Sequence, residues 1–271
     1  MMDALFFARS IGYKVVWTMH NVYPHDSTTR ELDHLARLAI TACASAVIVH
    51  CNYARGLLAR HFHRTERVFL APHGHFCDAY PNRVSRAGAR AKFGFEDRHF
   101  VYHFFGNVRS NKGVDQLLDA FLALPGNDVR FLFAARLCTD YSERIVERAR
   151  NADPRIVLRE SKFYANEEFQ WFFNAADVSV FPFTDILTSG TAITALSFHC
   201  PVVVPAIGCL PELIDSTVGA TYDPAEPGAL LHALTAARSI NRDALRPGIE
   251  QRLRELSWDR IARTTLEAYH A

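Results

Sequence analysis

The chain has 271 residues, of which 49% are hydrophobic, and its 30 Lys and Arg residues nearly balance its 29 Asp and Glu residues. This length suffices for one large domain or two modest ones, and the hydrophobic content suffices for a buried core. A formal net charge of +1 provides no polyelectrolyte surface, so the composition disfavours a nucleic-acid partner.

The first part of the chain alternates between helical and extended patterns. Residues 3–10 are typical of a helix that stops near Gly12, and residues 14–19 form an apolar run typical of a buried strand. The pattern continues with a helix over 28–44, a strand over 46–50, a helix over 53–61 and a strand over 67–71. Such alternation predicts a parallel sheet with helical crossovers.

Residues 72–90 are rich in Pro, Gly, Asn and Arg and break the periodicity, so we place the domain linker there. A second α/β series follows, with strands predicted near 99–105, 129–135, 155–158, 178–182, 201–204 and 219–222. Its helices are predicted near 113–123, 141–151, 167–175, 191–198, 227–238, 243–255 and 258–269. This series is close to a complete six-stranded doubly wound domain. The predicted fold class is therefore α/β with two Rossmann-like domains, an incomplete one at 1–88 and a complete one at 89–255, followed by a C-terminal crossover helix at 256–271.

The strongest candidate site follows the strand predicted at 178–182. Thr188, Ser189, Gly190 and Thr191 place small hydroxyls and a bare backbone at the start of the next helix. Backbone N–H groups and the helix dipole favour a phosphate at such a position. The alternative is an ordinary helix cap, with a glycine that allows close packing.

A second candidate anion site follows the strand predicted at 99–105. Gly106 allows a close backbone approach, while Arg109 and Lys112 supply charge that can reach a diphosphate. A solvated basic turn is the alternative. Both candidate sites lie at the carboxyl edge of one sheet, where open α/β sheets bind ligands. Glu212 opens a further short helix at this edge, either to accept hydrogen bonds from ribose or sugar hydroxyls or to complement a helix dipole.

Polar and titratable residues crowd the loop after the first strand, namely His20, Asn21, His25 and Asp26. This composition suits acid/base chemistry or sugar binding. A purely structural loop is the alternative, and metal ligation by His20 and His25 lacks a third ligand at a recognisable spacing. We therefore predict no metal site.

His73 and Gly74 end the last strand of the first half. We predict that they line the cleft between the two domains. A linker turn is the alternative reading.

Together these motifs resemble the family 4 type of retaining glycosyltransferases, and more closely a bacterial subgroup similar to β-mannosyltransferases of exopolysaccharide or glycolipid assembly. The matching segments are 18–26, 72–75, 105–115, 186–190 and 208–214, in order along nearly the whole chain. The resemblance implies a GT-B fold of two Rossmann-like domains, in which the C-terminal domain holds a nucleotide-sugar donor and the N-terminal domain largely holds the acceptor. It also implies that the first strands of the N-terminal domain are missing.

The resemblance also implies roles for individual residues. Arg109 and Lys112 would hold the diphosphate, and residues 188–191 would hold phosphate and sugar. Glu212 would lie near the donor, and His20 would face the sugar from across the cleft.

The chain also departs from the family pattern. The family's Glu-x7-Glu pair falls on Ile186 and Thr194, so neither carboxylate is present. Asn107 replaces the arginine usually found after the strand-end glycine. The stereochemical outcome, retaining or inverting, is therefore open.

We expect a metal-independent hexosyltransferase that uses no cofactor, because its GDP- or UDP-sugar is a substrate. The sugar suggested by the subgroup is mannose, and the acceptor is a glycan or a lipid-linked saccharide of polysaccharide biosynthesis. An inverting reaction needs a base that deprotonates the acceptor hydroxyl, and His20 and Asp26 are the candidates for it. One rival function, favoured by the missing carboxylates, is a catalytically inactive nucleotide-sugar-binding or scaffolding subunit. Another is a GT-B-like phosphorylase or epimerase, which would use the same anion site.

The N-terminus lacks a basic n-region and a cleavage site, so it is not typical of a signal peptide, and we expect a cytoplasmic protein. Peripheral contact with the inner membrane face is a further hypothesis, since acceptors in such pathways are often lipid-linked. Basic residues that suit an anionic lipid surface gather in the first half: Arg30, Arg37, Arg55, Arg60, His61, His63 and Arg64. Solvated helix faces are the alternative reading.

Overall fold

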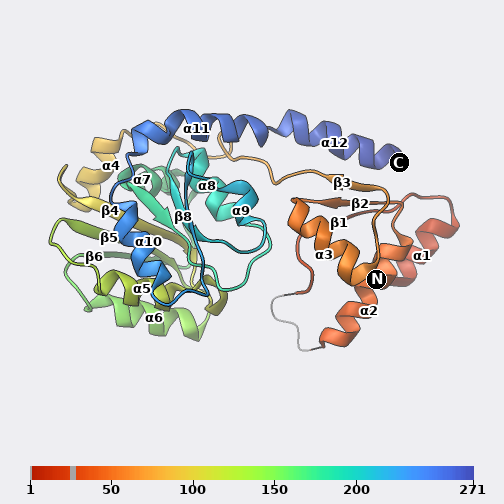
Figure 1. Cartoon of the computed structure of the whole chain (residues 1–271), viewed down its shortest axis with the longest axis horizontal. Helices are drawn as coiled ribbons and strands as arrows, with labels where there is room; N and C mark the ends of the chain where they lie inside the picture. Colours follow the sequence, from red (N-terminus) through yellow and green to blue (C-terminus); the bar gives the residue numbers. More distant parts are fainter. Residues whose placement is uncertain (1, 25–28) are drawn as a thin grey trace. The chain divides into compact units, whose positions relative to one another are not determined.

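The computed structural model describes residues 2–24 and 29–271. The chain divides into two compact units, shown in Figure 1. Unit 1 consists of Met1–Gly74 and Glu255–Ala271, and unit 2 of His75–Arg254. The division after Gly74 falls within the segment 72–90, where the sequence predicts the linker.

Unit 1 is built on a three-stranded parallel sheet of order β1-β2-β3. Its elements are α1 (Met2–Ser10), β1 (Val16–Thr18), α2 (Arg30–Cys43), β2 (Ala46–Val49), α3 (Asn52–Phe62), β3 (Val68–Leu70) and α12 (Trp258–His270). All four residues of the central strand β2 are buried, which explains its uninterrupted apolar sequence. The register pairs Thr18 with Ile48 and Val49 with Leu70, so the three carboxyl ends share one edge.

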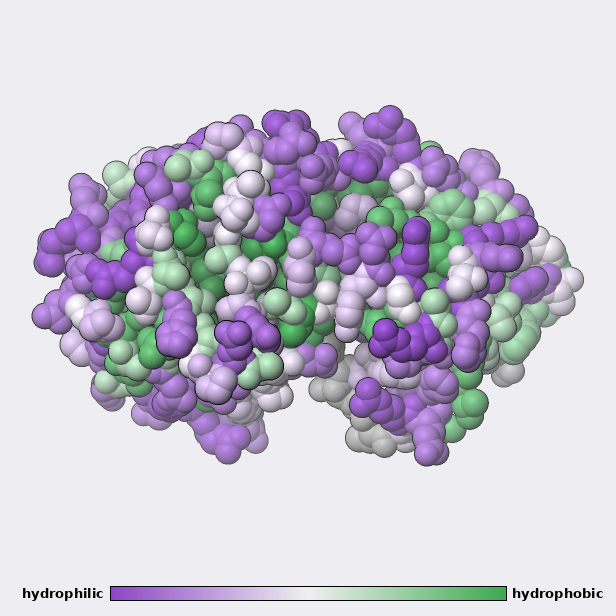
Figure 2. All heavy atoms as spheres, viewed as in Figure 1, coloured by the Kyte–Doolittle hydropathy of each residue, from purple (hydrophilic) through white to green (hydrophobic). Residues whose placement is uncertain are grey.

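The C-terminal helix α12 belongs to the core of unit 1. Ile261 and Ala268 on its inner side pack with Ala46, Ile48 and Ala71 of the sheet region. Figure 2 shows hydrophilic residues on the side of α12 in view. The helix is thus amphipathic, with its apolar stripe turned to the sheet, as the sequence pattern predicts.

Unit 2 contains a six-stranded parallel sheet of order β6-β5-β4-β7-β8-β9. Its first half comprises α4 (Arg86–Phe93), β4 (Phe100–Asn107), the 3-10 helix η1 (Ser110–Lys112), α5 (Val114–Leu122), β5 (Val129–Arg136), α6 (Asp140–Arg150) and β6 (Ile156–Ser161). Its second half comprises η2 (Asn166–Glu168), α7 (Phe169–Ala175), β7 (Val178–Val180), α8 (Gly190–Ser197), β8 (Val202–Pro205), α9 (Leu210–Leu213), β9 (Gly219–Tyr222), α10 (Ala229–Ala237) and α11 (Arg242–Glu255). The strand order reverses between β4 and β7, which makes their carboxyl ends the topological switch point of the sheet.

Helices cover both faces of the sheet of unit 2. Figure 1 shows α5, α6 and α10 on one face and α4, α7 and α8 on the other. Phenylalanines dominate the core between these layers, among them Phe104, Phe131, Phe133, Phe173 and Phe181, each less than 2% exposed. Because both faces are covered, the central strands are apolar along almost their whole length.

Most predicted helices and strands are found within a few residues of their expected bounds. The exception is α4, which lies partly inside the segment predicted as a linker. Its caps are regular, since the Ser85 hydroxyl accepts from the Gly88 N–H and Gly94 ends the helix at φ +73°. Tertiary contacts hold it, because the buried Arg90 pairs with Asp177 at 3.2 Å. A composition-based prediction overlooks a helix stabilised by such a pair.

The longest helices, α2 and α11, have 14 residues each, fewer than the roughly 20 that a bilayer requires. Within residues 2–24 and 29–271 no helix has both the length and the apolar character to cross a membrane.

Candidate functional site

Three loops lie together at the carboxyl edge of the sheet of unit 2. They follow β4, β7 and β8, which are neighbours in the sheet. The Thr184 N–H donates to the Asn111 carbonyl at 3.0 Å, and the Cys209 N–H donates to the Leu187 carbonyl at 2.9 Å. Main-chain hydrogen bonds therefore join all three loops into one structure at the switch point.

Two glycines allow this close packing. Gly113 has φ +60°, and a Cβ there would lie 2.0 Å from the Pro182 carbonyl oxygen. Gly208 has φ +58°, and a Cβ there would lie 2.3 Å from the Ile186 carbonyl oxygen. A side chain at either position would combine an unfavourable backbone conformation with a collision against main chain.

A pocket of about 70 Å³ opens among the first two loops. It is lined by Phe104, Phe105, Gly106, Asn107, Lys112, Phe181, Phe183 and Thr191. Residues from both predicted anion motifs thus meet around one space: Gly106 and Lys112 from the first, and Thr191 from the second. Asn107, where the sequence departs from the pattern of the family that it resembles, also lines this pocket.

Lys112 supplies the positive charge of the pocket. It ends η1 and is half-buried, with its Nζ atom 4.6 Å from the centre of the Phe183 ring. Burial lowers the pKa of the Lys112 ammonium, and the nearby Arg109 guanidinium lowers it further. An anion bound here would relieve both effects, since it supplies the counter-charge that solvent does not. Arg109 itself is exposed at the start of η1 and does not line the pocket.

The start of α8 provides amide groups beside Lys112. Ser189 is 4% exposed, and its hydroxyl accepts from the Ala192 N–H at 3.1 Å, so it serves as the helix N-cap. The amides of Gly190 and Thr191 lie in the same first turn, where N–H groups have no intrahelical carbonyl. Thr188 is half-buried just before the cap. The cap reading therefore holds for Ser189, and the amide ends of α8 remain suited to an anion.

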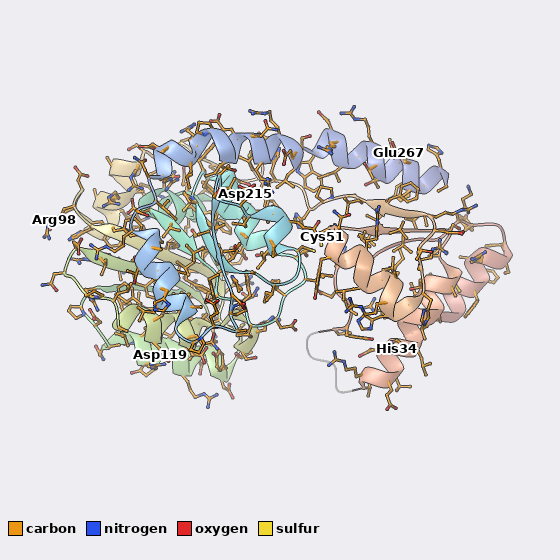
Figure 3. All side chains as sticks on the ribbon, in the orientation of Figure 1. His34, Cys51, Arg98, Asp119, Asp215 and Glu267 are labelled. Atoms are coloured by element: carbon orange, nitrogen blue, oxygen red, sulfur yellow. The ribbon has the colours of Figure 1, made fainter. Side chains whose placement is uncertain are left out.

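Glu212 lies on the short helix α9, exposed and outside the residues that line the pocket. Arg252 of α11 donates to the carbonyls of Glu212 and Leu213 at 2.8 and 2.6 Å. The same guanidinium pairs with Asp215 at 2.7 Å, and Asp215 is labelled in Figure 3. Arg252 thus fixes the position of α9 relative to the sheet.

Ile186 and Thr194 are the positions at which the sequence departs from the Glu-x7-Glu pair of the family that it resembles. Thr194 is 6% exposed, and its hydroxyl donates to the Gly190 carbonyl at 2.9 Å. Ile186 is half-buried in the loop before α8, where its carbonyl faces Gly208. Both positions thus take part in the packing of the loops.

Three histidines gather at the carboxyl edge of the sheet of unit 1, each after a different strand. His50 Nε2 lies 3.0 Å from His20 Nδ1, and His50 Nδ1 lies 2.8 Å from the Ala71 carbonyl oxygen. The ring of His73 is centred 6.2 Å from that of His50, and its Nδ1 donates to the Gly74 carbonyl at 2.9 Å. The predicted residues His20 and His73 therefore belong to one cluster whose centre is His50.

Burial shapes the protonation of this cluster. Partial burial and the nearby His73 lower the pKa of His20. Burial lowers the pKa of His50, and the charges that His20 and His73 would carry lower this pKa further. The hydrogen bond to the Ala71 carbonyl has the opposite, smaller effect. Both rings are consequently neutral near pH 7, the state in which imidazole accepts a proton.

His50 is not among the site residues predicted from the sequence, although a signal for it was available. His50 directly follows the fully buried run 46–49, and the residue after a central strand of a parallel sheet lies at the ligand-binding edge.

The other candidates of unit 1 have varied positions. Asn21 is half-buried next to His20. Gly74 is buried, and a Cβ there would lie 2.5 Å from the Trp258 ring, so packing within unit 1 accounts for this glycine. His25 and Asp26 lie outside the described residues. In the ranges 2–24 and 29–271, no three His, Cys, Asp or Glu residues are arranged to hold a metal ion.

Comparisons with known proteins identify the family and the fold of the chain. Residues 99–238, more than half of the chain, match the family model described as glycosyl transferases group 1. A comparison with curated proteins finds no match.

Solved structures provide the fold comparison. Sucrose-phosphate synthase from Thermosynechococcus elongatus is 20% identical with a TM-score of 0.83, over 98% of this chain and 70% of that chain. HepE of Anabaena in complex with UDP and glucose is 17% identical with a TM-score of 0.81, over 100% and 76%. A UDP-forming α,α-trehalose-phosphate synthase from Burkholderia xenovorans is 15% identical with a TM-score of 0.74, over 99% and 71%. The fold is α/β of the GT-B type with Rossmann-like units.

Proposed function

Because the chain belongs to the glycosyl transferases of group 1, we propose that it moves a hexose from a nucleotide sugar to a glycan or lipid-linked saccharide in polysaccharide biosynthesis. One observation carries this proposal, namely the pocket at the switch point of unit 2. It brings Gly106, Lys112 and Thr191 around one space. A cation beside helix N-terminal amides suits a diphosphate, the charged group common to nucleotide sugars.

The proposed reaction is a substitution at the anomeric carbon of the donor. The acceptor hydroxyl oxygen forms a bond to that carbon, and the bond from the carbon to the diphosphate oxygen breaks. The electron pair leaves with the nucleoside diphosphate, whose growing charge Lys112, Arg109 and the α8 amides neutralise. In this mechanism these groups stabilise the leaving diphosphate in place of a metal ion, and no cofactor takes part.

The proton of the acceptor hydroxyl needs a base. We propose His20 for this role, because its neutral ring lies at the sheet edge of unit 1 and its pKa is lowered by partial burial and by His73. Asp26, which lies outside the described residues, is the second candidate from the sequence.

For the donor we propose a GDP- or UDP-linked hexose. The sequence motifs resemble those of β-mannosyltransferases, so GDP-mannose is the first donor to test. UDP-glucose is the second, because HepE of Anabaena has been solved in complex with it at 18% identity to this chain. Isothermal titration with GDP-mannose, UDP-glucose and the bare nucleotides separates the base preference from the sugar preference.

The decisive experiment replaces the pocket cation. Lys112→Ala should weaken binding of UDP or GDP by about 10- to 100-fold, since a hydrogen bond to a charged group contributes about 1.5–3 kcal/mol. Arg109→Ala should cost less, because its exposed charge is screened. Lys92→Ala is the matched control: Lys92 also lies over an aromatic ring of unit 2, Trp171, at 4.3 Å, yet does not line the pocket. Unchanged affinity in both Lys112→Ala and Arg109→Ala would remove the diphosphate assignment.

A second candidate function is an inactive subunit that binds nucleotide sugar without transferring it. The observation that favours it is the absence of both family carboxylates, since Ile186 and Thr194 occupy their places. Donor binding without transfer to any saccharide acceptor and without hydrolysis of the donor would support this candidate. Turnover with donor and acceptor together would exclude it.

We further propose a cytoplasmic location with peripheral contact to the inner membrane face. The proposal rests on the number of basic residues in unit 1, although contacts within the unit already engage three of them. Arg30 and Arg37 lie over the rings of Tyr23 and Trp17, and Arg64 donates to the Ser45 carbonyl at 2.9 Å. Flotation with vesicles that contain anionic lipid tests the contact. A lack of salt-sensitive binding would reject it.

A further inference from the structure

His50 occupies the central position of the histidine cluster in unit 1 because of the strand order. β2 lies between β1 and β3, and the register pairs Thr18 with Ile48 and Val49 with Leu70. Continuing that register two residues past Thr18 and one past Leu70 places His20 on one side of His50 and Ala71 on the other. The observed distances of 3.0 Å to His20 Nδ1 and 2.8 Å to the Ala71 oxygen fit this placement.

The chemistry of the partners fixes the direction of both hydrogen bonds. The Ala71 carbonyl oxygen can only accept, so the Nδ1 atom of His50 carries a proton and donates it. A neutral imidazole has one protonated nitrogen, which leaves Nε2 of His50 as an acceptor. The proton between the two rings must then reside on Nδ1 of His20, which donates to His50.

The opposite arrangement would require a doubly protonated His50. Burial and the neighbouring rings of His20 and His73 lower the pKa of His50 and disfavour that state, against the opposing hydrogen bond to Ala71. His50 is also half-buried, where an unpaired positive charge is costly. The neutral form therefore sets the direction of the chain of bonds from His20 to Ala71.

We propose that His50 is a positioning residue that holds His20 in the Nδ1–H tautomer and so presents the unprotonated Nε2 of His20 as the acceptor for a sugar hydroxyl. The identity of that hydroxyl rests on the proposed function, whereas the tautomer does not. His20 is exposed, so its ring is accessible to a ligand. Without His50, a neutral His20 would populate both tautomers, and in one of them Nε2 carries a hydrogen and cannot accept.

In sugar transfer this arrangement has a defined consequence. The acceptor hydroxyl donates its hydrogen to Nε2 of His20 while its oxygen bonds to the anomeric carbon, and the nucleoside diphosphate leaves with the electron pair of the broken bond. His20 then carries both ring protons, and the Nδ1–H bond to His50 orients the cation. The role of His50 resembles that of the carboxylate in a catalytic triad, which fixes the tautomer of a histidine base.

Nuclear magnetic resonance of the ring nitrogens tests the tautomer on the full chain without any substrate. At pH 7.5 we expect His20 to show a protonated Nδ1 and an unprotonated Nε2. His50→Gln should preserve this pattern, because a glutamine amide can donate to Ala71 and accept from His20. His50→Leu should shift His20 to a mixture that contains the Nε2–H form. A wild-type His20 protonated on Nε2, or a His20 unaffected by His50→Leu, would overturn the proposal.

His34→Leu is the matched control. His34, labelled in Figure 3, is another half-buried histidine of unit 1 with a side-chain partner, since its Nδ1 lies 2.9 Å from the Tyr23 hydroxyl. Its loss should leave the His20 ring signals unchanged. If both leucine variants alter His20 alike, the effect is a general disturbance of unit 1 and the positioning role is rejected.

Kinetics separate this inference from the proposed function. With donor and acceptor saturating, His50→Leu should lower kcat by about 10- to 100-fold, part of what a general base contributes, while His50→Gln stays within a few fold of the wild type. Affinity for UDP or GDP, a property of unit 2, should be unchanged in both. An expected NMR pattern in a chain that transfers no sugar would refute the proposed function and leave the tautomer assignment intact. Equal kcat in His50→Leu and wild type would refute the catalytic use of the tautomer.

Discussion

At the carboxyl edges of the two parallel sheets, different chemical groups make the connecting hydrogen bonds. In unit 2, three loops are joined main chain to main chain, and two glycines admit the carbonyls of Pro182 and Ile186. In unit 1, side chains make the connections, from the His20 ring to the His50 ring to the Ala71 carbonyl. The main-chain amides at the edge of the unit 2 sheet keep one arrangement at any pH. The imidazole rings at the edge of the unit 1 sheet act as hydrogen-bond donors or acceptors according to which ring nitrogens carry protons. The first suits a permanent anion, and the second suits proton transfer.

The largest expected effect on stability comes from a change in the joined loops of unit 2. Gly113→Ala introduces a Cβ 2.0 Å from the Pro182 oxygen at φ +60°. We expect the free energy of unfolding of unit 2 to fall by about 3–5 kcal/mol, because strain and a collision with main chain add. Urea unfolding followed by the indole NMR signal of Trp171, the tryptophan within residues 75–254, reports on this unit.

Gly94→Ala separates the two contributions. Gly94 has a similar φ of +73°, but a Cβ there meets nothing within 4 Å, so this variant carries strain alone, about 1–2 kcal/mol. Equal losses in the two variants would show that the contact with Pro182 is easily relaxed and that the loops are less tightly joined than described.

The next effect concerns the loss of stability at low pH. Unit 2 also contains a buried imidazole, that of His103. Burial, aided by the charge of Arg242, lowers the pKa of His103 to about 3. A histidine with a lowered folded pKa binds more protons when unfolded, so its contribution is complete above pH 6.5 and is lost as the pH falls towards the folded pKa. Between pH 6.5 and 4 this amounts to about 3 kcal/mol.

His103→Phe should remove that part of the pH dependence, whatever its effect on stability at pH 7. Urea unfolding of unit 2 at a series of pH values measures the slope, with the exposed His232→Gln as the control. Unit 1 should show the same sign through His20 and His50, whose pKa values are also lowered. A slope that His103→Phe leaves unaltered would contradict the assignment.

A smaller effect distinguishes a helix cap from a ligand site. Ser189→Ala should cost about 1 kcal/mol of stability, the usual value for a lost N-cap, and should weaken nucleotide binding a few fold by loosening the first turn of α8. Ser85→Ala is the matched control, since Ser85 caps α4 in the same way by accepting from Gly88 at 3.1 Å. It should cost similar stability without affecting nucleotide affinity, measured by isothermal titration. Equal affinities in the two variants would separate the α8 terminus from the nucleotide site.

The smallest expected effect is that of metal removal. If Lys112, Arg109 and the α8 amides hold the diphosphate, excess EDTA should leave the affinity for UDP or GDP within twofold of its value in added Mg²⁺. Titration in both buffers measures this. An affinity that depends on Mg²⁺ would show that Lys112, Arg109 and the α8 amides do not bind the diphosphate without a metal ion.

The sequence patterns were informative where local chemistry decides structure. The apolar run within 46–50 predicts a buried strand, and the small residues 188–191 predict a helix start. The helix α4 was missed because the pairing of Arg90 with Asp177, 87 residues away, stabilises it. His50 was missed because nothing local marks it as the partner of His20; that pairing depends on the register of β1 and β2.

The amino-acid sequence by itself determined the alternation of strands and helices, the apolar runs that become buried strands, and the residue types at each strand end. Those properties follow from side-chain periodicity and backbone preferences within a few residues. Only the tertiary structure decided which strand ends are neighbours, so that Lys112 meets Thr191 in one pocket and His20 meets His50 through one hydrogen bond. Strand order and register arise from long-range packing of whole elements, and no short segment of sequence encodes them.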